Sequence, residues 1–393
     1  MIAPEGLNIG SNKNHCKTLN KRINPLFIIM ENNEFETQNE EVTEIVVPQN
    51  TSEGIAVTAS DAKQEEFNVV NDLSQNRLDL SRVRAAIDAV KNELLKVIVG
   101  QEEMMDLLIA AILCDGHVLI EGVPGIAKTM TAKLLAKTVH AEFSRIQFTP
   151  DLMPSDVVGT MVFNMQTSQF YFNEGPVFSN IVLIDEINRA PAKTQSALFE
   201  VMEERQVTVD GKTYPMSFPF FVIGTQNPIE QEGTYKLPEA QLDRFLFKIN
   251  MEYPSLEEEK SILRRFKEDF RQVKTAEVHS VLRGEDIRAC QELVEKVHIK
   301  DELLDYIAAI IHNTRNNGDL FLGASPRASL AILKTSKAIA AMNGRDFVIP
   351  EDIQYVAYPV LNHRIIITPE REMEGYTTAD VIKDIVKKIE VPR

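Results

Sequence analysis

One stretch of the sequence has the residue types needed to hold phosphate groups. Residues 121–136 read EGVPGIAKTMTAKLLA and follow an apolar run that favours a strand. Gly122 and Gly125 permit backbone conformations that turn amides inward toward phosphate oxygens, and the helix expected next adds its positive end. Lys128 can reach the β- and γ-phosphates of a nucleotide, and the Thr129 hydroxyl can bind Mg²⁺.

This loop departs in one position from the usual phosphate-loop pattern. Ala127 stands where that pattern has Gly directly before the Lys. An incidental Gly-rich turn is therefore the alternative interpretation of these residues alone. The expected nucleotide-binding residues of the loop are Gly122, Val123, Pro124, Gly125, Ile126, Ala127, Lys128, Thr129 and Met130.

Two adjacent carboxylates stand at the end of a second apolar run. This run covers residues 181–184 and is followed by Asp185 and Glu186. Carboxylates at the end of a buried strand are costly unless a cation or polar chemistry uses them. We expect Asp185 to hold Mg²⁺ and Glu186 to polarise the water that attacks the γ-phosphate. Alternatively, the pair caps the helix after it, because acidic residues also suit helix starts.

A third strand-like run, at 220–224, also ends in polar residues, among them Asn227. In a parallel sheet its carboxyl end would lie beside the acidic strand end, where ligands bind. Asn227 is therefore expected to touch the γ-phosphate or the attacking water, although Asn before Pro is also a common turn signal. Residues 207–216 alternate about the Asp-Gly pair at 210–211, which predicts a hairpin that projects from the sheet.

The order of the periodic segments predicts how these residues are positioned. A helical period begins near Leu78, and short β-rich runs then alternate with helical patterns from residue 100 to about 250, which predicts a parallel sheet between helices. Beyond Pro254 the β-rich runs stop and helical periods take over. The expected strands are 117–121, 145–148, 181–185, 220–224 and 245–250, and the expected late helices are 286–297, 301–315, 326–342 and 350–361.

Composition sets limits on the class of protein. With 393 residues, 44% of them apolar and 25% charged, the chain is neither fibrous nor wholly disordered and has length for two or three domains. Its apolar runs fall far short of the ~18 residues that span a bilayer, so a soluble, cytoplasmic protein is expected. A formal charge of −16 disfavours stable nucleic-acid binding. Three scattered cysteines suggest neither disulfides nor zinc.

The first 77 residues differ from the rest of the chain. Residues 31–76 hold eleven acidic residues against one lysine and keep no period, so a disordered acidic tail is expected. Residues 1–29 place basic residues before a short apolar run. That run is too short for a signal peptide, and no small-residue cleavage site follows it, so export is not expected. We hypothesise that translation begins at Met30.

Several strings in the folded part resemble the AAA+ ATPases, and the MoxR subfamily in particular. They are EGVPGIAKT, FTPDLMPSDVVGT, LIDEINRAPAKTQSALFEVMEE, GTQNPIEQEGTYKLPEAQLDRF and GASPRA. The resemblance runs from about Leu78 to Val391, and Ala127 fits it because MoxR proteins commonly carry AKT. It leaves residues 1–77, the expected disordered tail, outside, and it implies an AAA+ α/β core over 78–254 with a helix-2 insert and an all-helical lid domain over 255–393.

The resemblance also assigns roles that spacing does not. Asn227 matches the sensor-1 polar residue, Arg244 the arginine finger, and Arg327 the sensor-2 arginine. A planar, always-charged guanidinium suits the charge of a transferring phosphoryl group. Surface salt bridging is the alternative for Arg244, and a place at a helix start is the alternative for Arg327. The residues that match the segment beside the adenine are Val99, Gly100 and Gln101.

An arginine finger implies that a neighbouring subunit completes each site, and the resemblance implies a homo-oligomeric ring of six subunits. The resemblance implies an ATP- and Mg²⁺-dependent ATPase that acts as a chaperone-like remodelling or maturation factor, with protein clients that include von Willebrand factor A domain proteins. The insert at 151–174 would grip clients through its methionine and aromatic residues. The alternatives are a metal-chelatase-type motor subunit, a DNA-acting motor and a nucleotide-binding scaffold that does not turn over.

Overall fold

The computed structural model describes most of the chain beyond residue 77, namely residues 78–123, 125–228, 235–267 and 277–392. The predicted acidic tail, the suggested start at Met30 and Pro124 of the phosphate loop lie outside the described residues. Every described residue belongs to one unit, which covers residues 66–393. In this part of the chain, no helix combines the length and the apolar character needed to cross a membrane.

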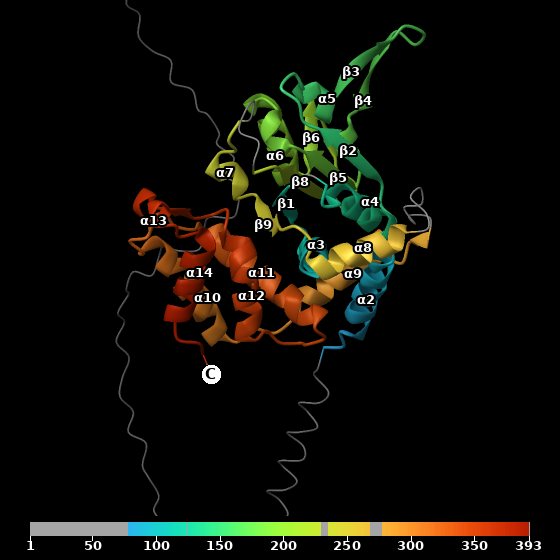
Figure 1. The fold of residues 1–393 in the computed structure, drawn as a ribbon. Helices are drawn as coiled ribbons and strands as arrows, with labels where there is room; N and C mark the ends of the chain where they lie inside the picture. Colours follow the sequence, from blue (N-terminus) through green and yellow to red (C-terminus); the bar gives the residue numbers. More distant parts are fainter. Residues whose placement is uncertain (1–77, 124, 229–234, 268–276, 393) are drawn as a thin grey trace, which may run out of the picture. The chain divides into compact units, whose positions relative to one another are not determined.

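In the described residues, a five-stranded parallel sheet has the order β2-β5-β8-β1-β9 (Figure 1). Each strand lies at one of the β-rich runs, so the predicted α/β sheet is confirmed. The strand expected at 181–185 has those bounds in the structure, whereas the bounds of the other four strands differ from the expected ones by one or two residues. The strands are β1 (His117–Gly122), β2 (Phe143–Gln147), β5 (Ile181–Asp185), β8 (Phe221–Gln226) and β9 (Phe245–Met251).

Both faces of the sheet are buried, which explains why its strands read as apolar runs. Along β5, Ile181 and Leu183 join one hydrophobic cluster, while Val182 and Ile184 join a second. This alternation is the two-residue period of a strand. Helix α6 contributes to the second cluster, whereas α2, α3 and α4 contribute to the first. The sheet therefore lies between two helical layers.

The helices of the α/β part follow the amphipathic pattern read from the sequence. In α2, the residues spaced by three and four positions, such as Val83, Ile87 and Val90, are buried. The helices of this part are α2 (Ser81–Leu95), α3 (Glu102–Leu113), α4 (Lys128–Thr138), α5 (Pro154–Val158), α6 (Ala192–Glu204) and α7 (Glu239–Leu242), with short 3₁₀ turns at Pro176–Phe178 and Ile187–Arg189.

The later part is a helical lid, as predicted, and three of its four expected helices have the expected bounds. One addition is a two-stranded antiparallel ribbon of β10 (Leu320–Leu322) and β11 (Ile366–Ile367), which is too short to give a periodic signal. The helices are α8 (Leu256–Phe266), α9 (Gly284–Glu295), α10 (Asp301–Arg315), α11 (Pro326–Met342), α12 (Pro350–Leu361), α13 (Pro369–Met373) and α14 (Thr378–Lys388).

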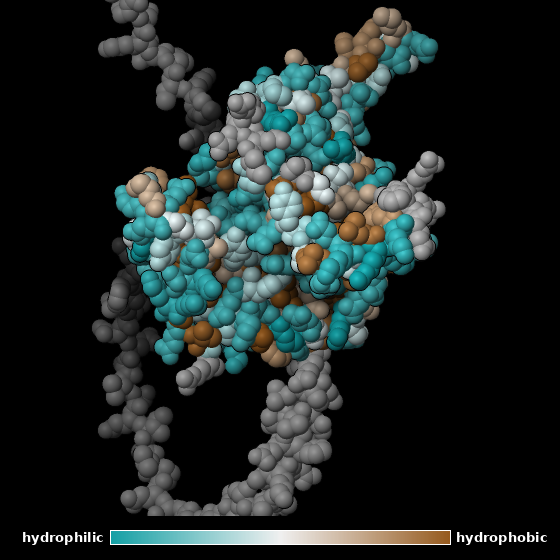
Figure 2. Space-filling view, in the orientation of Figure 1, coloured by the Kyte–Doolittle hydropathy of each residue, from teal (hydrophilic) through white to brown (hydrophobic). Residues whose placement is uncertain are grey.

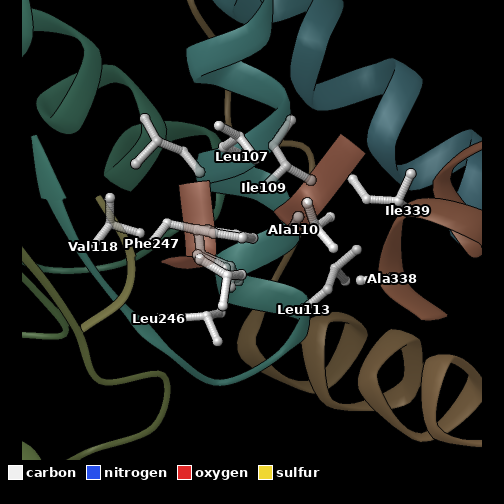
Figure 3. Close-up of a cluster of buried hydrophobic side chains, with 14 of the residues drawn as sticks. Leu107, Ile109, Ala110, Leu113, Val118, Leu246, Phe247, Ala338 and Ile339 are labelled. Atoms are coloured by element: carbon white, nitrogen blue, oxygen red, sulfur yellow. The ribbon is translucent and has the colours of Figure 1, made fainter. Parts of the chain in front are cut away.

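One hydrophobic core continues from the sheet into the lid. Figure 3 shows α3 with Leu107 and Ala110 between Phe247 of the sheet and Ile339 of α11. The same cluster includes buried residues of α10 and α12. The lid is therefore joined to the sheet by packing as well as by the chain.

Two hairpins stand outside the main sheet. The Asp-Gly pair closes the predicted one, β6 (Gln206–Val209) with β7 (Lys212–Pro215), and its φ angles of 52° and 74° are those of a type I′ turn. The second, β3 (Gly159–Asn164) with β4 (Gln169–Glu174), extends away from the sheet (Figure 1). The Phe172 and Tyr214 rings, with centroids 4.4 Å apart, join the two hairpins.

Candidate nucleotide site

The register of the sheet brings the polar strand ends to one edge. Gln147 pairs with Asp185, and Glu121 pairs with Gln226 next to Asn227. A pocket of about 570 Å³ lies at this edge. Its lining residues are Gly125, Ala127, Lys128, Thr129, Met130, Lys133, Arg145, Gln147, Asp185, Glu186, Thr225, Gln226 and Asn227. The loop, the acidic strand end and the sensor-1 candidate are thus gathered as expected.

The backbone of the phosphate loop requires small residues at defined positions. A Cβ on Gly122 would lie 2.8 Å from Ile126 Cδ1 and 2.9 Å from Met251 Cβ, so the strand end has no room for a side chain. Gly125 has a φ of +90°, with open space where a Cβ would stand. Ala127 has a φ of 60°, in the left-handed region that glycine adopts more easily. This conformation explains why the usual pattern has Gly at that position.

Lys128 begins helix α4, and its side chain folds back over the loop. Its Nζ donates a hydrogen bond of 2.6 Å to the carbonyl oxygen of Gly122. Burial lowers the pKa of Lys128, while Asp185, Glu121 and Glu186 oppose that effect. The ammonium group therefore lies among carboxylates at the helix start, where a phosphate would find both a cation and backbone amides.

Asp185 is buried and held by two side chains. Arg145 Nε lies 2.5 Å from its Oδ2, and the Thr225 hydroxyl donates to its Oδ1 over 3.1 Å. The same hydroxyl accepts a hydrogen bond of 3.1 Å from the backbone amide of Glu186. Thr225 on β8 therefore fixes the positions of both residues that end β5.

Glu186 is turned toward the pocket by an uncommon backbone conformation. Its φ of 56° lies in the left-handed region, which costs a non-glycine residue roughly 1–2 kcal/mol. Its Oε2 accepts a hydrogen bond of 2.8 Å from Gln147 Nε2 and lies 3.1 Å from Arg189 Nε. Both oxygen ligand types that Mg²⁺ prefers in nucleotide sites, a hydroxyl at Thr129 and a carboxylate at Asp185, line the same pocket.

Sequence reasoning missed three residues that position these carboxylates. Arg145 and Gln147 lie on the predicted strand β2 and share one side of it, because they are two residues apart. Their polar types at a strand end next to the acidic strand were an available signal. Thr225 follows the apolar run at 220–224, but its bridging role depends on the strand register, which spacing does not give. Among the described residues, no group of three or more His, Cys, Asp or Glu side chains is arranged to hold a metal ion.

The segment expected beside the adenine lies next to the loop. Val99 is half-buried, and Gly100 and Gln101 both have positive φ, of 68° and 59°. Gln101 Nε2 donates a hydrogen bond of 3.1 Å to the carbonyl oxygen of Ile126, while its buried Oε1 has no hydrogen-bond partner among the described residues. Gln101 also lines a second pocket, of about 380 Å³, together with Met251, Tyr253, Glu258 and Tyr358 of the core edge and lid.

The two arginines expected to contact phosphate lie elsewhere. Arg327 Nη2 lies 2.8 Å from Glu203 Oε1, and Arg244 Nε lies 3.9 Å from Glu203 Oε2. Arg244 also donates to the carbonyl oxygen of Phe199. Neither arginine is among the residues that line the pocket of Lys128. The structure thus brings Arg244 and Arg327 to each other, at the end of α6, and not to the phosphate loop.

Comparisons with known proteins agree with this architecture. Residues 117–247 match the model of the ATPase family associated with various cellular activities (AAA), and residues 312–385 match the AAA lid domain. The chain is 48% identical over 297 residues to the uncharacterized protein YeaC of Bacillus subtilis, covering 76% of this chain and 92% of YeaC. It is 43% identical over 310 residues to Chaperone MoxR1 of Mycobacterium tuberculosis, covering 77% of this chain and 81% of MoxR1.

A solved structure supports the same conclusion. A protein from Cytophaga hutchinsonii, assigned as an ATPase, superposes with a TM-score of 0.73 at 42% identity, covering 85% of this chain and all of that one. By its close relatives, its two matched domains and its fold, the chain belongs to the MoxR family of AAA+ ATPases.

Proposed function

We propose that the protein hydrolyses ATP with Mg²⁺ and uses the energy to remodel or mature protein clients. The observation that supports this most directly is the shared pocket of Lys128, Asp185 and Glu186. A phosphate-binding lysine, a carboxylate for the metal and a carboxylate for the water are the parts that phosphoryl transfer to water requires.

Each residue has a role that follows from its position. Lys128 and the loop amides would hold the β- and γ-phosphates, and Val99, Gly100 and Gln101 would contact the base. Thr129 and Asp185 would hold Mg²⁺, which would draw electron density from the phosphate oxygens. Glu186 accepts a proton from the attacking water as the water oxygen bonds to the γ-phosphorus and the β–γ bridging bond breaks. Asn227 orients that water or the γ-phosphate.

The arginines support a ring in which neighbouring chains share sites. Because Arg244 and Arg327 meet at Glu203 rather than in their own pocket, we assign both to the nucleotide of a neighbouring subunit. A head-to-tail contact of this kind closes into a ring, and we propose a cytoplasmic hexamer by family analogy.

The client-facing surface is proposed to include the β3–β4 hairpin. Phe163, Met165 and Phe170 are exposed on it, and Met165 is 88% exposed. Figure 2 shows the hydrophobic residues of this hairpin standing clear of the sheet. Exposed apolar residues on a projecting element are typical of protein-binding surfaces. A relative named as a chaperone supports remodelling, and clients with von Willebrand factor A domains are our proposal by family analogy.

Two substitutions test the assignment of the pocket. Lys128→Ala should weaken ATP binding, whereas Glu186→Gln should keep ATP binding and lower turnover by about 10²- to 10⁴-fold. Lys193→Ala, in the first turn of α6 and outside the pocket, serves as the control lysine and should leave both unchanged. Fluorescent ATP-analogue binding and phosphate release measure the two effects. Equal ATP affinity in the Lys128 and Glu186 variants would refute these roles.

A trapping experiment tests the remodelling role. The Glu186→Gln protein is used to capture partners from native lysate with and without ATP, because a chain that binds but does not hydrolyse ATP should hold its client. Partners recovered only with ATP support remodelling and identify the client. If none is enriched while the wild type hydrolyses ATP, the remodelling proposal fails, and stimulation of turnover by a chelatase partner becomes the next test.

A further inference from the structure

The residue before Arg244 joins the core to the lid. One carboxylate oxygen of Asp243 lies 2.7 Å from Arg364 Nε, and the other accepts a hydrogen bond of 2.9 Å from the Ser325 hydroxyl. Arg364 follows α12, and Ser325 precedes α11. Asp243 therefore contacts two separate segments of the lid with its two oxygens.

Arg364 is held rigidly in this arrangement. Its side chain is only 3% exposed, and it also donates to the carbonyl oxygens of Asp243, at 3.2 Å, and Phe245, at 2.6 Å. The two residues before Arg364 bond to the same strand. His363 Nε2 lies 3.0 Å from the carbonyl oxygen of Phe245, and Asn362 Nδ2 donates a hydrogen bond of 2.9 Å to the carbonyl oxygen of Lys248. Together they cover β9, the last strand in the sheet order, with lid side chains.

Ser325 links Asp243 to Arg327. It is the N-cap of α11, and its hydroxyl oxygen accepts a hydrogen bond of 3.2 Å from the backbone amide of Arg327. Asp243 is thus adjacent to Arg244 in the chain, and its carboxylate is linked to the Arg327 amide through the hydroxyl group of Ser325. Glu203 is the acceptor that the two guanidinium groups share at their other ends.

We propose that Asp243 is a positioning residue that holds Arg244 and Arg327 as one unit for the nucleotide of the neighbouring subunit. This inference rests on the proposed function. Three arginines and two carboxylates make up the group, which leaves one net positive charge among Arg244, Arg327, Arg364, Asp243 and Glu203. Long arginine side chains lose much conformational freedom when they bind. The hydrogen bonds from Asp243 through Ser325 fix where the Arg327 backbone stands relative to Arg244, so no backbone freedom remains to be lost when both arginines bind at the shared site.

Mixed rings distinguish this role from a purely structural one. A full-length Asp243→Asn chain keeps its own nucleotide pocket but should present its arginines poorly, so kcat should fall about tenfold or more while KM for ATP changes less than about twofold. A Lys128→Ala chain has a defective nucleotide pocket but an intact arginine pair. In an equimolar mixture, about one quarter of head-to-tail contacts join an intact pocket to an intact arginine pair, so about that fraction of wild-type activity should return. Mixing Asp243→Asn with Arg244→Ala should restore nothing.

Matched variants separate positioning from stability. Asp352→Asn removes a lid carboxylate that binds Arg345 at 2.6 and 2.7 Å, and it should lower the melting temperature without lowering kcat. Ser325→Ala removes only the hydroxyl link, and Thr377→Ala removes the equivalent cap of α14. Ser325→Ala should lower kcat and be restored by Lys128→Ala chains, whereas Thr377→Ala should keep full kcat.

The other outcomes of the mixing experiment separate failure of the Asp243 role from failure of the proposed ring. If Arg244→Ala recovers with Lys128→Ala but Asp243→Asn does not, Asp243 acts within its own subunit and the positioning role is wrong. If Arg244→Ala itself does not recover, sites are not shared between chains, and the proposed ring and this inference both fail. Should Asp243→Asn not fold, Ser325→Ala carries the test, and unchanged kcat in that variant overturns the proposal.

Discussion

Glu186 shares its carboxylate with two donors, and this contact bears on its chemistry. Gln147 and Arg189 both reach Oε2, at 2.8 and 3.1 Å. Each donor occupies a lone pair of Oε2, so this oxygen is already engaged before water approaches. A residue that must take a proton from water is therefore restrained by the neighbour that orients it.

Substitution of Gln147 tests this restraint. Gln147→Ala removes one donor from Glu186 Oε2 and frees that oxygen for the attacking water, so basal ATP turnover should rise roughly two- to fivefold. Steady-state phosphate release measures the change. The control is Gln354→Ala, in α12 of the lid, where the side chain donates to the Tyr306 hydroxyl. Lower turnover in Gln147→Ala would mean that the contact supports Glu186 instead.

The sequence predicted which residue types meet in the pocket, but not all of their partners. Lys128, Asp185 and Asn227 could be placed together because each stands at the end of an apolar run, and parallel strands end at one edge. The meeting of Arg244 and Arg327 at Glu203 could not be foreseen from spacing. It depends on how the lid packs against the end of α6, which only the folded chain determines.

At the scale of elements, the last strand of the sheet is covered by the segment after α12. An edge strand presents unpaired backbone groups. Here Arg364 and its two preceding residues bond to carbonyl oxygens of β9. The lid therefore stabilises the sheet through hydrogen bonds to its edge as well as through the core that α3 and α11 share (Figure 3).

Breaking this contact should be costly. Arg364→Met leaves Asp243 and several carbonyl groups without their cation, and loss of one partner of a buried pair costs about 3–5 kcal/mol of unfolding free energy. Arg371→Met is the control, because its side chain is 34% exposed beside Asp319, and solvent-screened ion pairs contribute much less to stability than buried ones. Urea denaturation measures both variants. Equal losses would show that burial of the Arg364 pair does not matter.

The three small β elements outside the main sheet differed in how well they could be predicted from the sequence. The β6–β7 hairpin was predicted because an Asp-Gly pair has a defined turn geometry. The β3–β4 hairpin was recognised only as an insert by resemblance, since half-exposed strands outside the core show no clear apolar alternation. The ribbon of β10 and β11 pairs two or three residues per strand, and a period of two cannot be read from so few positions.

At the scale of the whole molecule, two buried histidines lie where elements join. His117 on β1 accepts a hydrogen bond from the Val222 amide at Nδ1, 3.0 Å away, and its Nε2 lies 3.2 Å from the Met202 carbonyl of α6. His363 joins the lid to β9. Burial lowers the pKa of His117 to about 3, with a smaller effect from Arg205, and burial likewise lowers the pKa of His363.

These histidines make stability depend on pH in a defined direction. The folded-state pKa of His117, about 3, lies below the ordinary value of 6.5, so the unfolded chain binds more protons between these values. The stabilisation is complete above about pH 6.5 and is lost as pH falls toward 3. From pH 7.5 to 5, His117 alone should lower the unfolding free energy by about 2 kcal/mol.

Substitution of His117 separates its contribution from that of the carboxylates. His117→Asn keeps an acceptor near the Val222 amide but cannot be protonated, so its unfolding free energy should lose about 2 kcal/mol less than the wild type between pH 7.5 and 5. His140→Asn is the matched control, because His140 is exposed and has a φ of 48°, a conformation that Asn tolerates. Urea denaturation across this pH range gives both slopes. Parallel slopes for wild type and His117→Asn would show that His117 does not govern acid stability.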